Sequence, residues 1–324
     1  MTVLVTGGLG AIGSWVLREL VARGERPLVF DARPDTSLIP DVVDAIDLRI
    51  GDILDLPHIL RLGQEHGVDR ILHLAALMPP PCQANPYQGF RVNAEGSVLM
   101  MEAARLLHVR RIVCMSSKAA YGPITGEAGY PTYRPVNEDY PRNPTNVYGA
   151  TKLAVEHMGL EYHRSYGLDF VALRLSSTYG PGKQERHGAV GIPSMVIENA
   201  YYGRPTRLPQ GADERNDLVY NRDVARAIVL AGYAEGLEHR IFNISSGELT
   251  TLPELAAILR ERIPSVDFEM GPGLNYMETD KPSYCLFDIS RARRELGYEP
   301  CYDLRRGVDD YLAILDRLSA GAAV

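Results

Sequence analysis

The stretch Val3-Leu4-Val5-Thr6-Gly7-Gly8-Leu9-Gly10-Ala11-Ile12-Gly13 joins a short apolar run to closely spaced glycines. The apolar run predicts a β-strand, and the amphipathic pattern over residues 11–23 predicts a helix directly after it. Glycines at such a junction permit a tight turn and let the backbone and the helix N-terminus approach a pyrophosphate, whose charge the helix dipole favours. The stretch therefore predicts a dinucleotide-binding turn. Its expected cofactor-binding residues are Gly7, Gly10, Ala11, Ile12 and Gly13.

A carboxylate follows the second apolar run. Residues 28–30 lead into Asp31, eighteen residues after Gly13. A carboxylate at this place accepts hydrogen bonds from a ribose diol and repels a 2′-phosphate. Asp31 thus favours NAD over NADP as the cofactor, although Arg33 close by points mildly the other way.

The first 175 residues alternate short apolar runs with helical patterns. Strands are predicted over residues 3–5, 28–30, 48–50, 71–74, 112–115 and 170–173, and helices lie between most of them, as over 11–23 and 94–107. Strand and helix in alternation predict an α/β fold with a Rossmann-type, doubly wound parallel sheet.

The alternation becomes irregular after Tyr179-Gly180-Pro181-Gly182. Helices are predicted over residues 190–202, 223–233, 252–262 and 304–318, with strands over 218–220 and 241–244. We expect an NAD-binding domain over residues 1–178 and about 216–245. A smaller, partly interleaved substrate-binding lobe is expected over 179–215 and 246–324.

Composition restricts the class of protein. The 324 residues are 45% hydrophobic and 23% charged, as in an ordinary globular protein, and the net charge of −7 without long single-sign runs does not suggest a nucleic-acid partner. Four cysteines lie far apart without a Cys-x-x-Cys pair, which predicts reduced thiols and no zinc site. The N-terminus lacks signal-peptide features, and no apolar run is long enough to span a bilayer. We therefore expect a cytoplasmic protein with no membrane partner.

The pentapeptide Tyr148-Gly149-Ala150-Thr151-Lys152 can carry acid/base chemistry. Residues four apart on a helix are neighbours, so Lys152 would lie beside Tyr148. A tyrosine that acts as a base near neutral pH needs nearby positive charge, because its ordinary pKa is about 10. The spacing predicts that the Lys152 ammonium supplies this charge and lowers the pKa of Tyr148.

Several further motifs occur in a specific order. They are Gly51-Asp52-Ile53, His73-Leu74-Ala75-Ala76, Asn93-Ala94-Glu95-Gly96-Ser97, Met115-Ser116-Ser117-Lys118-Ala119-Ala120-Tyr121-Gly122, Leu173-Arg174-Leu175 and Tyr179-Gly180-Pro181. With the glycine turn and Tyr148/Lys152, the array resembles the extended short-chain dehydrogenase/reductase superfamily, in particular its NAD-dependent epimerase/dehydratase family. The resemblance covers nearly the whole chain.

The resemblance implies roles at matching positions. Tyr148 would exchange the proton of a substrate hydroxyl while hydride passes between that carbon and nicotinamide, and Lys152 would hold the nicotinamide ribose. Ser117, four residues before Tyr121, would bind the reacting oxygen, with Ser116 as the neighbouring candidate. Cofactor contacts are further implied for Asp52, Ile53, Ala75, Asn93 and Ser116.

The resemblance leaves the net reaction open. Epimerases of the family return the hydride to the same carbon, whereas dehydrogenases release an oxidised product and NADH. A sugar epimerase, possibly acting on a nucleotide sugar, is slightly favoured; a dehydrogenase of a sugar, sugar acid or small hydroxy acid is the alternative. A catalytically inactive NAD-sensing protein is a remote third hypothesis. Lys118-Ala119 stands where sugar dehydratases carry an Asp-Glu pair, which argues against a 4,6-dehydratase.

The substrate side departs from the family pattern. Ser177 replaces an asparagine typical of nucleotide-sugar epimerases, and Asn216 replaces a diphosphate-binding arginine, for which Arg215 would substitute. Other candidate cations for a phosphate are Arg207, Lys183 and Arg186. Met78, in the proline-rich segment 77–82, is expected in a wall beside the nicotinamide.

Other expectations concern loops, structural residues and assembly. The segment between Tyr121 and Tyr148, which contains Tyr130, Tyr133 and Tyr140, can cover a site or form an ordered surface loop. His73 and Arg174, at strand ends, are expected to be structural, and no metal is assigned. By resemblance, residues 94–107 and 148–166 would form a homodimer interface.

Overall fold

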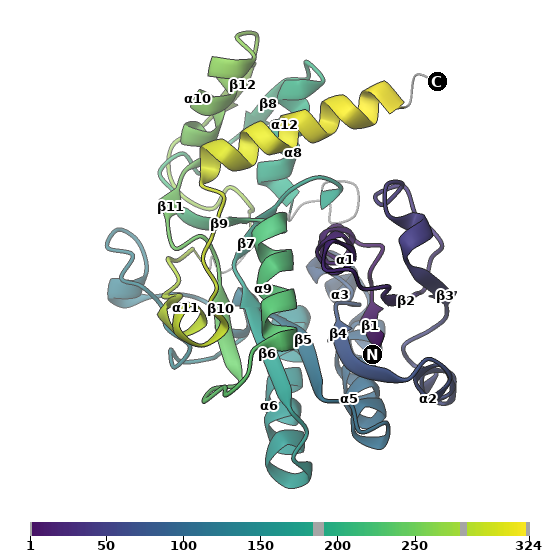
Figure 1. Ribbon diagram of the computed structural model, residues 1–324. Coiled ribbons are helices and arrows are strands. Elements are labelled where there is room, and N and C mark those ends of the chain that lie inside the picture. Colours follow the sequence, from purple (N-terminus) through teal and green to yellow (C-terminus); the bar gives the residue numbers. More distant parts are fainter. Residues whose placement is uncertain (1, 184–190, 279–283, 322–324) are drawn as a thin grey trace.

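Seven parallel strands form the central sheet of the computed structural model, which describes residues 2–183, 191–278 and 284–321 (Figure 1). Their order is β10-β6-β5-β4-β1-β2-β3. The strands are β1 (Thr2–Thr6), β2 (Leu28–Asp31), β3 (Asp47–Ile50), β4 (Val68–His73), β5 (Arg111–Ser117), β6 (Phe170–Leu175) and β10 (Ile241–Ile244). The predicted α/β class with a parallel, doubly wound sheet is confirmed.

Helices cover both faces of this sheet. One face carries α1 (Gly13–Ala22), α9 (Asn221–Tyr233) and α11 (Ser290–Leu296), and the other carries α2 (Leu56–Glu65), α5 (Gly96–Leu106) and α6 (Val147–Tyr166). Successive strand residues point to opposite faces, so Val3 and Val5 belong to the first core while Leu4 belongs to the second. Burial on both faces explains why these strands read as continuous apolar runs.

The strand order reverses between β1 and β4. The chain passes from β1 to β2 and β3 on one side, and β4 pairs with β1 on the other. In an open α/β sheet, ligands bind outside the carboxyl ends of the strands at such a reversal. The glycine turn follows β1 directly, and it therefore lies at this position.

A third core packs against the carboxyl end of the sheet, at the top of Figure 1. It includes Val196, Leu255 and Tyr311 from the helices α8 (Ile192–Tyr201), α10 (Leu252–Arg262) and α12 (Leu304–Gly321). Strands β7 (Ser177–Tyr179), β9 (Asn216–Tyr220) and β11 (Leu249–Thr250) form a second sheet, and β8 (Thr206–Leu208) pairs with β12 (Phe268–Met270). This core joins residues from both segments that the sequence assigns to the substrate lobe.

Short elements complete the chain. They are α3 (Pro79–Ala84), α4 (Pro86–Phe90), a π-helical turn (Arg91–Glu95) and 3₁₀ turns at Val43–Ala45, Lys118–Ala120 and Gly126–Ala128. Helix boundaries differ from prediction by at most three residues: α1 begins at Gly13 rather than at residue 11, and α12 ends at Gly321 rather than at residue 318. Val190, the predicted start of α8, and Arg186 lie outside the described residues. Within the described ranges, none of the helices has the length and apolar character needed to cross a membrane.

Candidate active site

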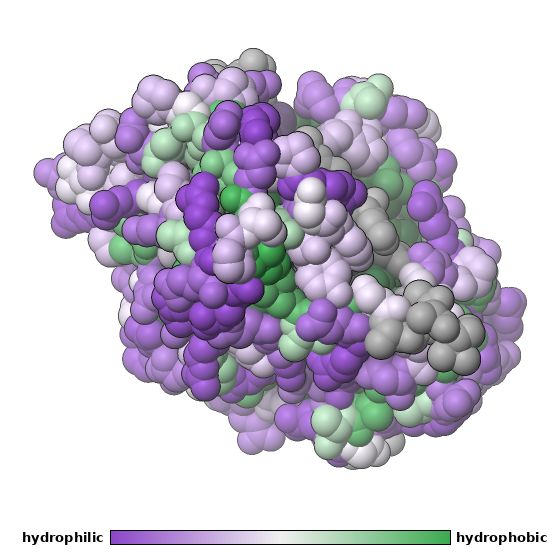
Figure 2. All heavy atoms as spheres, turned by 90° about the horizontal axis from the view of Figure 1, so that it is seen from above, coloured by the Kyte–Doolittle hydropathy of each residue, from purple (hydrophilic) through white to green (hydrophobic). Residues whose placement is uncertain are grey.

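A cavity of about 1330 Å³ lies at the carboxyl ends of the sheet strands. Seen from above, this end of the molecule is mostly hydrophilic, with apolar residues visible in its recesses (Figure 2). Most sequence-predicted residues line the cavity, namely Gly7, Gly10, Ala11, Ile12, Gly13, Asp31, Asp52, Ile53, Ala75, Met78, Ser116, Ser117, Tyr148, Lys152 and Ser177. Asn93 and Arg215 are absent from its wall. The volume exceeds the roughly 300–1000 Å³ of ordinary ligand pockets, so it can accommodate a dinucleotide and a second ligand.

The glycine turn is too crowded for side chains. A Cβ atom on Gly13 would lie 2.4 Å from the Gly7 carbonyl oxygen, and one on Gly7 would lie 2.7 Å from the Ala75 nitrogen. Gly7 also has a φ of +67°, in the left-handed region that favours glycine. The bare backbone before α1 leaves room for a pyrophosphate against the helix N-terminus, so these residues fit a dinucleotide.

Two aspartates mark the far end of the cavity from Tyr148. Asp31 accepts hydrogen bonds from the Leu9 nitrogen at 3.1 Å and from the Arg33 nitrogen at 3.2 Å. Asp52 accepts one from the Leu54 nitrogen at 2.9 Å. Asp31 therefore anchors the glycine turn itself, a role the sequence did not reveal, while it also faces the cavity.

Asn93 lies behind the wall of the cavity and does not line it. The side chain is fully buried; it accepts from the Leu77 nitrogen at 2.7 Å and donates to the Leu77 oxygen at 2.9 Å and to the Cys82 sulfur at 3.3 Å. These bonds hold the segment with Met78 and Pro79 against the cavity. Any effect of Asn93 on a ligand passes through this segment.

The start of α6 brings Tyr148 close to Ser117. Asn146 caps the helix by accepting from the Gly149 nitrogen at 2.8 Å. A Cβ atom on Gly149 would lie only 2.4 Å from the Ala119 oxygen. Glycine at this position therefore lets the first turn of α6 pack directly on the turn that follows Ser117, and Ser117 forms a hydrogen bond with the Tyr148 hydroxyl.

The pKa of Tyr148 in the protein without cofactor is set mainly by burial. Burial raises the pKa of Tyr148 to about 12, although the Ser117 hydrogen bond opposes this shift. Burial also lowers the pKa of Lys152 to about 8; its ammonium donates to the Met115 oxygen at 2.8 Å and lies 5.5 Å from the centre of the Tyr148 ring. Without cofactor, Lys152 therefore does not bring the pKa of Tyr148 below its usual value. The reason is that a lysine with a pKa of about 8 is already neutral where this tyrosine would titrate. The predicted lowering, to which the charge of the oxidised nicotinamide contributes, stays a prediction for the protein with NAD bound.

Ser116 and Arg174 belong to one buried network. Arg174 donates to both oxygens of Glu156, at 2.7 and 2.6 Å, and Ser116 donates to Glu156 at 2.5 Å. Arg174 is fully buried, and its pKa is raised above the usual value by Glu156 and Tyr121, against the opposing effect of burial. The network ties β6 to α6, so the hydroxyl of Ser116 is engaged with Glu156. Arg174 is a structural cation, as expected.

His73 is held by hydrogen bonds on both ring nitrogens. Its Nδ1 lies 2.7 Å from the Thr6 hydroxyl, and its Nε2 lies 3.0 Å from the Ser97 hydroxyl. Burial, and to a smaller extent Lys152, lowers the pKa of His73 to about 3. The ring is therefore neutral at physiological pH and links β1, β4 and α5, in agreement with a structural role.

Lysine is rare in this chain and concentrated in the cavity. The sequence contains four lysines among its 34 basic residues. All three lysines within the described residues, Lys118, Lys152 and Lys183, line the cavity. Lys118 donates to the Ser177 hydroxyl at 2.7 Å and to the Asn216 carbonyl oxygen at 3.3 Å, and Lys183 bonds the Thr178 hydroxyl. The sequence named Lys183 but missed Lys118 as a substrate-side group, since its role depends on contacts with distant strands.

Two of the predicted phosphate-binding arginines, Arg215 and Arg207, do not line the cavity. Arg215 is exposed, with its backbone nitrogen bonded to the Tyr133 hydroxyl. Arg207 is paired with Glu269 on β12 and with Asp267, the residue just before that strand. Arg33, at the Asp31 end, is the one arginine among the described residues that line the cavity. The positive charge near Tyr148 therefore comes from lysines.

The loop between Tyr121 and Tyr148 does not place its tyrosines in the cavity wall. Tyr130 lines a separate small hollow, Tyr133 accepts from Arg215, and Tyr140 bonds the backbone of Thr125. Tyr276 and Tyr284 line the cavity instead. Only their residue type could have drawn attention to them, because they lie in an irregular segment far from every motif.

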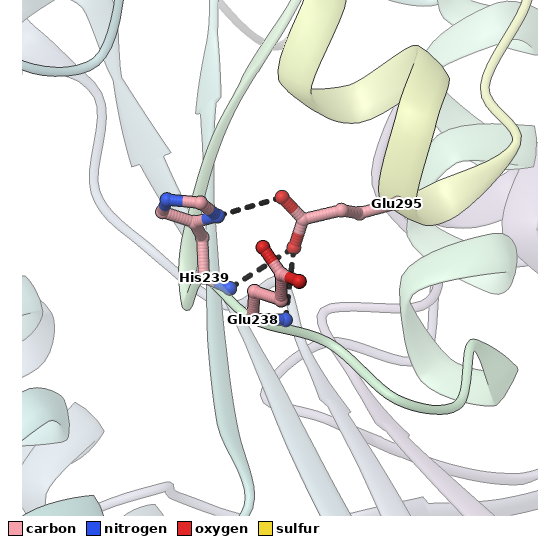
Figure 3. A group of neighbouring side chains, drawn as sticks. All are labelled: Glu238, His239 and Glu295. Carbon is pink, nitrogen blue, oxygen red and sulfur yellow. Dashed lines mark hydrogen bonds and ion pairs between the residues drawn. The ribbon is translucent and has the colours of Figure 1, made fainter.

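One group of potential metal ligands occurs among the described residues, remote from the cavity. Glu295 of α11 accepts from the backbone nitrogens of Glu238 and His239 at 3.0 Å and contacts the His239 Nδ1 at 2.6 Å (Figure 3). The Glu295 oxygens are thus engaged in fastening α11 to the segment before β10. This arrangement explains the cluster without an ion.

Comparison with known proteins gives a consistent result. The UDP-glucose 4-epimerase of Lacticaseibacillus casei is 31% identical over 94% of this chain and 93% of its own. The structure of a Thermus thermophilus UDP-glucose 4-epimerase in complex with NAD superposes with a TM-score of 0.83 at 27% identity, over 98% and 99% of the two chains. A partial-consensus L-threonine 3-dehydrogenase gives a TM-score of 0.84 at 25% identity, over 98% and 100%.

The family profile described as NAD dependent epimerase/dehydratase matches residues 3–245, which include the glycine turn, Ser117, Tyr148 and Lys152. Its cofactor is NAD, as the sequence predicted, and the family is one of enzymes. The chain therefore belongs to the NAD-dependent epimerase/dehydratase family of the extended short-chain dehydrogenase/reductases.

Proposed function

We propose that this enzyme is a sugar epimerase in which Tyr148 exchanges the proton of a substrate hydroxyl. One observation carries the proposal: Ser117, Tyr148 and Lys152 line the same cavity as the glycine turn. The 31% identity to a UDP-glucose 4-epimerase over nearly the whole chain supports epimerisation over net oxidation.

We assign some of these residues to cofactor binding and others to the reacting groups. The turn of Gly7, Gly10, Ala11, Ile12 and Gly13 would hold the pyrophosphate, Asp31 the ribose diol, and Asp52, Ile53 and Ala75 the adenosine and diphosphate flanks. Ser116 and Asn93 position strand β5 and the Met78 segment. Ser117 donates a hydrogen bond to the reacting oxygen, and Lys152 orients the nicotinamide ribose.

Proton transfer requires a lower tyrosine pKa than the protein alone provides. Bound NAD supplies the hydride acceptor and a positive charge near Tyr148. Positive charge close to a phenol favours the phenolate, and Lys152 provides a second proton-exchanging group one helical turn away. Tyr148 and Lys152 together therefore take up and return the substrate proton.

A dehydrogenase is the second candidate. The structural likeness to an L-threonine 3-dehydrogenase favours it, as does the absence of Arg215 from the cavity wall. Incubation with NAD and a panel of sugars, sugar acids and nucleotide sugars separates the two reactions. Epimerisation gives the epimer without NADH accumulation, whereas stoichiometric NADH release excludes a redox-neutral epimerase.

Substitution of Tyr148 by Phe tests the mechanism. Loss of a general acid/base typically costs about 10²- to 10⁴-fold in rate, and we expect a fall in kcat of this size with NAD binding retained. Tyr166→Phe is a matched control, because Tyr166 is on the same helix but 61% exposed. Full activity of Tyr148→Phe on the true substrate would disprove the role of Tyr148.

The proposed assembly is a homodimer in the cytoplasm. The helices α5 and α6 expose Leu106 and Met158, at 44% and 39%, and the four free cysteines suit a reducing compartment. Met158→Glu should convert a dimer to a monomer in light scattering. A monomeric parent protein would contradict the assembly. We likewise propose a domain of residues 1–178 and about 216–245 and a lobe of 179–215 and 246–324. The third core supports the lobe, and it also takes in Leu218 and Tyr220 of the segment 216–245.

A further inference from the structure

The two ends of the cavity carry opposite charge. The adenosine end contains Asp31, Asp35 and Asp52 together with Arg33. The end near Tyr148 contains Lys152 and Lys118, and no aspartate or glutamate lines it among the described residues. An ammonium near the reacting carbon, without a carboxylate in the cavity to neutralise it, attracts an anionic group of the substrate.

Lys118 is the ammonium best placed to meet such a group. It follows Ser117 directly in sequence, and its two acceptors among the described residues, Ser177 and Asn216, are neutral. An ammonium has three N–H donors and no acceptor, so one donor remains. The nearby acids Glu214 and Asp217 do not line the cavity. Tyr276 and Phe287 donate backbone N–H groups to one oxygen of each acid, and Oε1 of Glu214 is left without a hydrogen-bond partner among the described residues. Neither acid forms an ion pair with Lys118.

The hydrogen-bond directions leave further donors for a ligand. Because Lys118 can only donate, Asn216 presents its carbonyl oxygen to it and turns its amide group toward the Tyr276 hydroxyl, 3.3 Å away. Tyr276 therefore accepts from Asn216 and keeps its own proton to donate. Ser177 likewise accepts from Lys118 and keeps its proton. Lys118, Ser177 and Tyr276 all line the cavity.

Together they offer a ligand three N–H and O–H donors, one from each residue. A carboxylate is an acceptor-only group with about four lone-pair positions, which complements such a site. Lys118 and Ser117 line the same cavity, so the anion that Lys118 binds shares that cavity with the reacting carbinol.

We propose that Lys118, Ser177 and Tyr276, oriented by Asn216, bind a carboxylate of the substrate, which is accordingly a sugar acid. This inference rests on the hydride-transfer function proposed above and specifies its substrate class. Ser177 stands where nucleotide-sugar epimerases typically have an asparagine, and this proposal gives it a role in binding the substrate carboxylate.

The experiment measures binding without turnover. Tyr148→Phe enzyme loaded with NAD is titrated by calorimetry with two matched pairs: glucuronate with glucose, and UDP-glucuronic acid with UDP-glucose. We expect the acid of each pair to bind about 10- to 100-fold more tightly than its neutral counterpart, as for hydrogen bonds to charged groups. Adding Lys118→Met should remove this difference, and adding Lys118→Arg should restore part of it.

Matched controls locate the effect. Arg134→Met removes a positive charge from an exposed loop and should leave both preferences unchanged, whereas Tyr276→Phe should weaken acid binding selectively. Equal binding within both pairs, or a preference that Lys118→Met does not alter, would overturn the proposal. If both UDP sugars bind equally and Lys118→Met weakens both, the anion is the diphosphate, and the carboxylate assignment is wrong.

The carboxylate site and the proposed function are tested by separate measurements, so either one can be disproved without the other. The function depends on the kinetic effect of Tyr148→Phe, which is measured with any substrate that is turned over. The carboxylate site depends on acid-against-neutral binding in a protein that already lacks the Tyr148 hydroxyl.

Discussion

The two ends of the cavity are built in different ways. At the adenosine end, the contacts come from a continuous turn after β1, in which close backbone packing excludes side chains from Gly7 and Gly13. At the reaction end, side chains from β5, α6, β7, β9 and residues around Tyr276 meet through hydrogen bonds. The first end depends on local conformation, and the second depends on how distant elements pack. Substitutions at the adenosine end should therefore mainly weaken cofactor binding, whereas those at the reaction end should mainly lower kcat.

Gly13→Ala should give the largest effect, at the adenosine end. Its Cβ atom would lie 2.4 Å from the Gly7 oxygen and 2.6 Å from the Gly8 oxygen, and backbone cannot move aside as a flexible side chain can. Overpacking costs about 1–3 kcal/mol, so NAD affinity should fall by up to about 100-fold. Fluorescence titration with NADH measures this loss. Gly24→Ala is the control for backbone strain alone: Gly24 has a φ of +80° but nothing within 4 Å of an added Cβ atom. It should cost stability and leave NADH binding by the folded protein normal. Equal losses of NADH affinity in both variants would mean that crowding in the glycine turn is not the cause.

Gly149→Ala applies the same one-carbon change to the reaction end. The added methyl group would press on the Ala119 oxygen and separate Tyr148 from Ser117. A displacement of about 1 Å can cost on the order of 100-fold in rate, so kcat should fall by about 10- to 100-fold while NADH binding persists. Gly167→Ala, at the other end of α6, is the companion variant: it strains the backbone at a φ of +68° but has open space around the added methyl group, so it should cost stability and leave kcat unchanged. Loss of NADH binding in Gly149→Ala would show that the two ends are not separable.

The pH dependence of the reaction end is the next effect in size. Tyr148 and Lys152 lose their first shared proton near pH 8, because burial lowers the pKa of Lys152 to about 8 while that of Tyr148 is about 12. Only the singly deprotonated pair can accept the substrate proton. The kcat/KM for alcohol oxidation should therefore rise about tenfold per pH unit below pH 8 and level off above it.

Lys152→Met tests this assignment, since it removes the group that titrates. The plateau should disappear, and kcat/KM should keep rising through pH 9. NADH binding over the same pH range is the control for the adenosine end. A plateau at pH 8 in Lys152→Met would assign it to another group.

The contrast between the ends also explains what the sequence could predict. The glycine turn, Asp31 and Tyr148/Lys152 were predictable because their geometry follows from short spacings along one strand or helix. The parallel sheet followed from alternating apolar runs. The partnership of Lys118, Asn216 and Tyr276 could not be predicted, because residues 98 and 60 positions apart meet only in the fold. The burial that raises the pKa of Tyr148 could not be predicted either, since spacing reveals a neighbour but not the extent of burial.

Asp31→Asn should give the smallest effect, and it tests whether a change of charge at the adenosine end leaves the reaction end unaffected. The amide keeps the shape and can still accept from the Leu9 nitrogen, as the carboxylate does at 3.1 Å, so the glycine turn should survive. Only the charge toward the ribose is lost. A net hydrogen bond contributes about 0.5–1.5 kcal/mol, which predicts a rise in the KM for NAD of about 3- to 10-fold with kcat unchanged.

Because the repulsion of a 2′-phosphate also disappears in Asp31→Asn, while Arg33 remains in the cavity wall, NADP should become a better cofactor than in the parent enzyme. Steady-state kinetics with both cofactors measures the change. A fall in kcat would mean that Asp31 acts through the turn on the reaction end, so that the two ends are coupled.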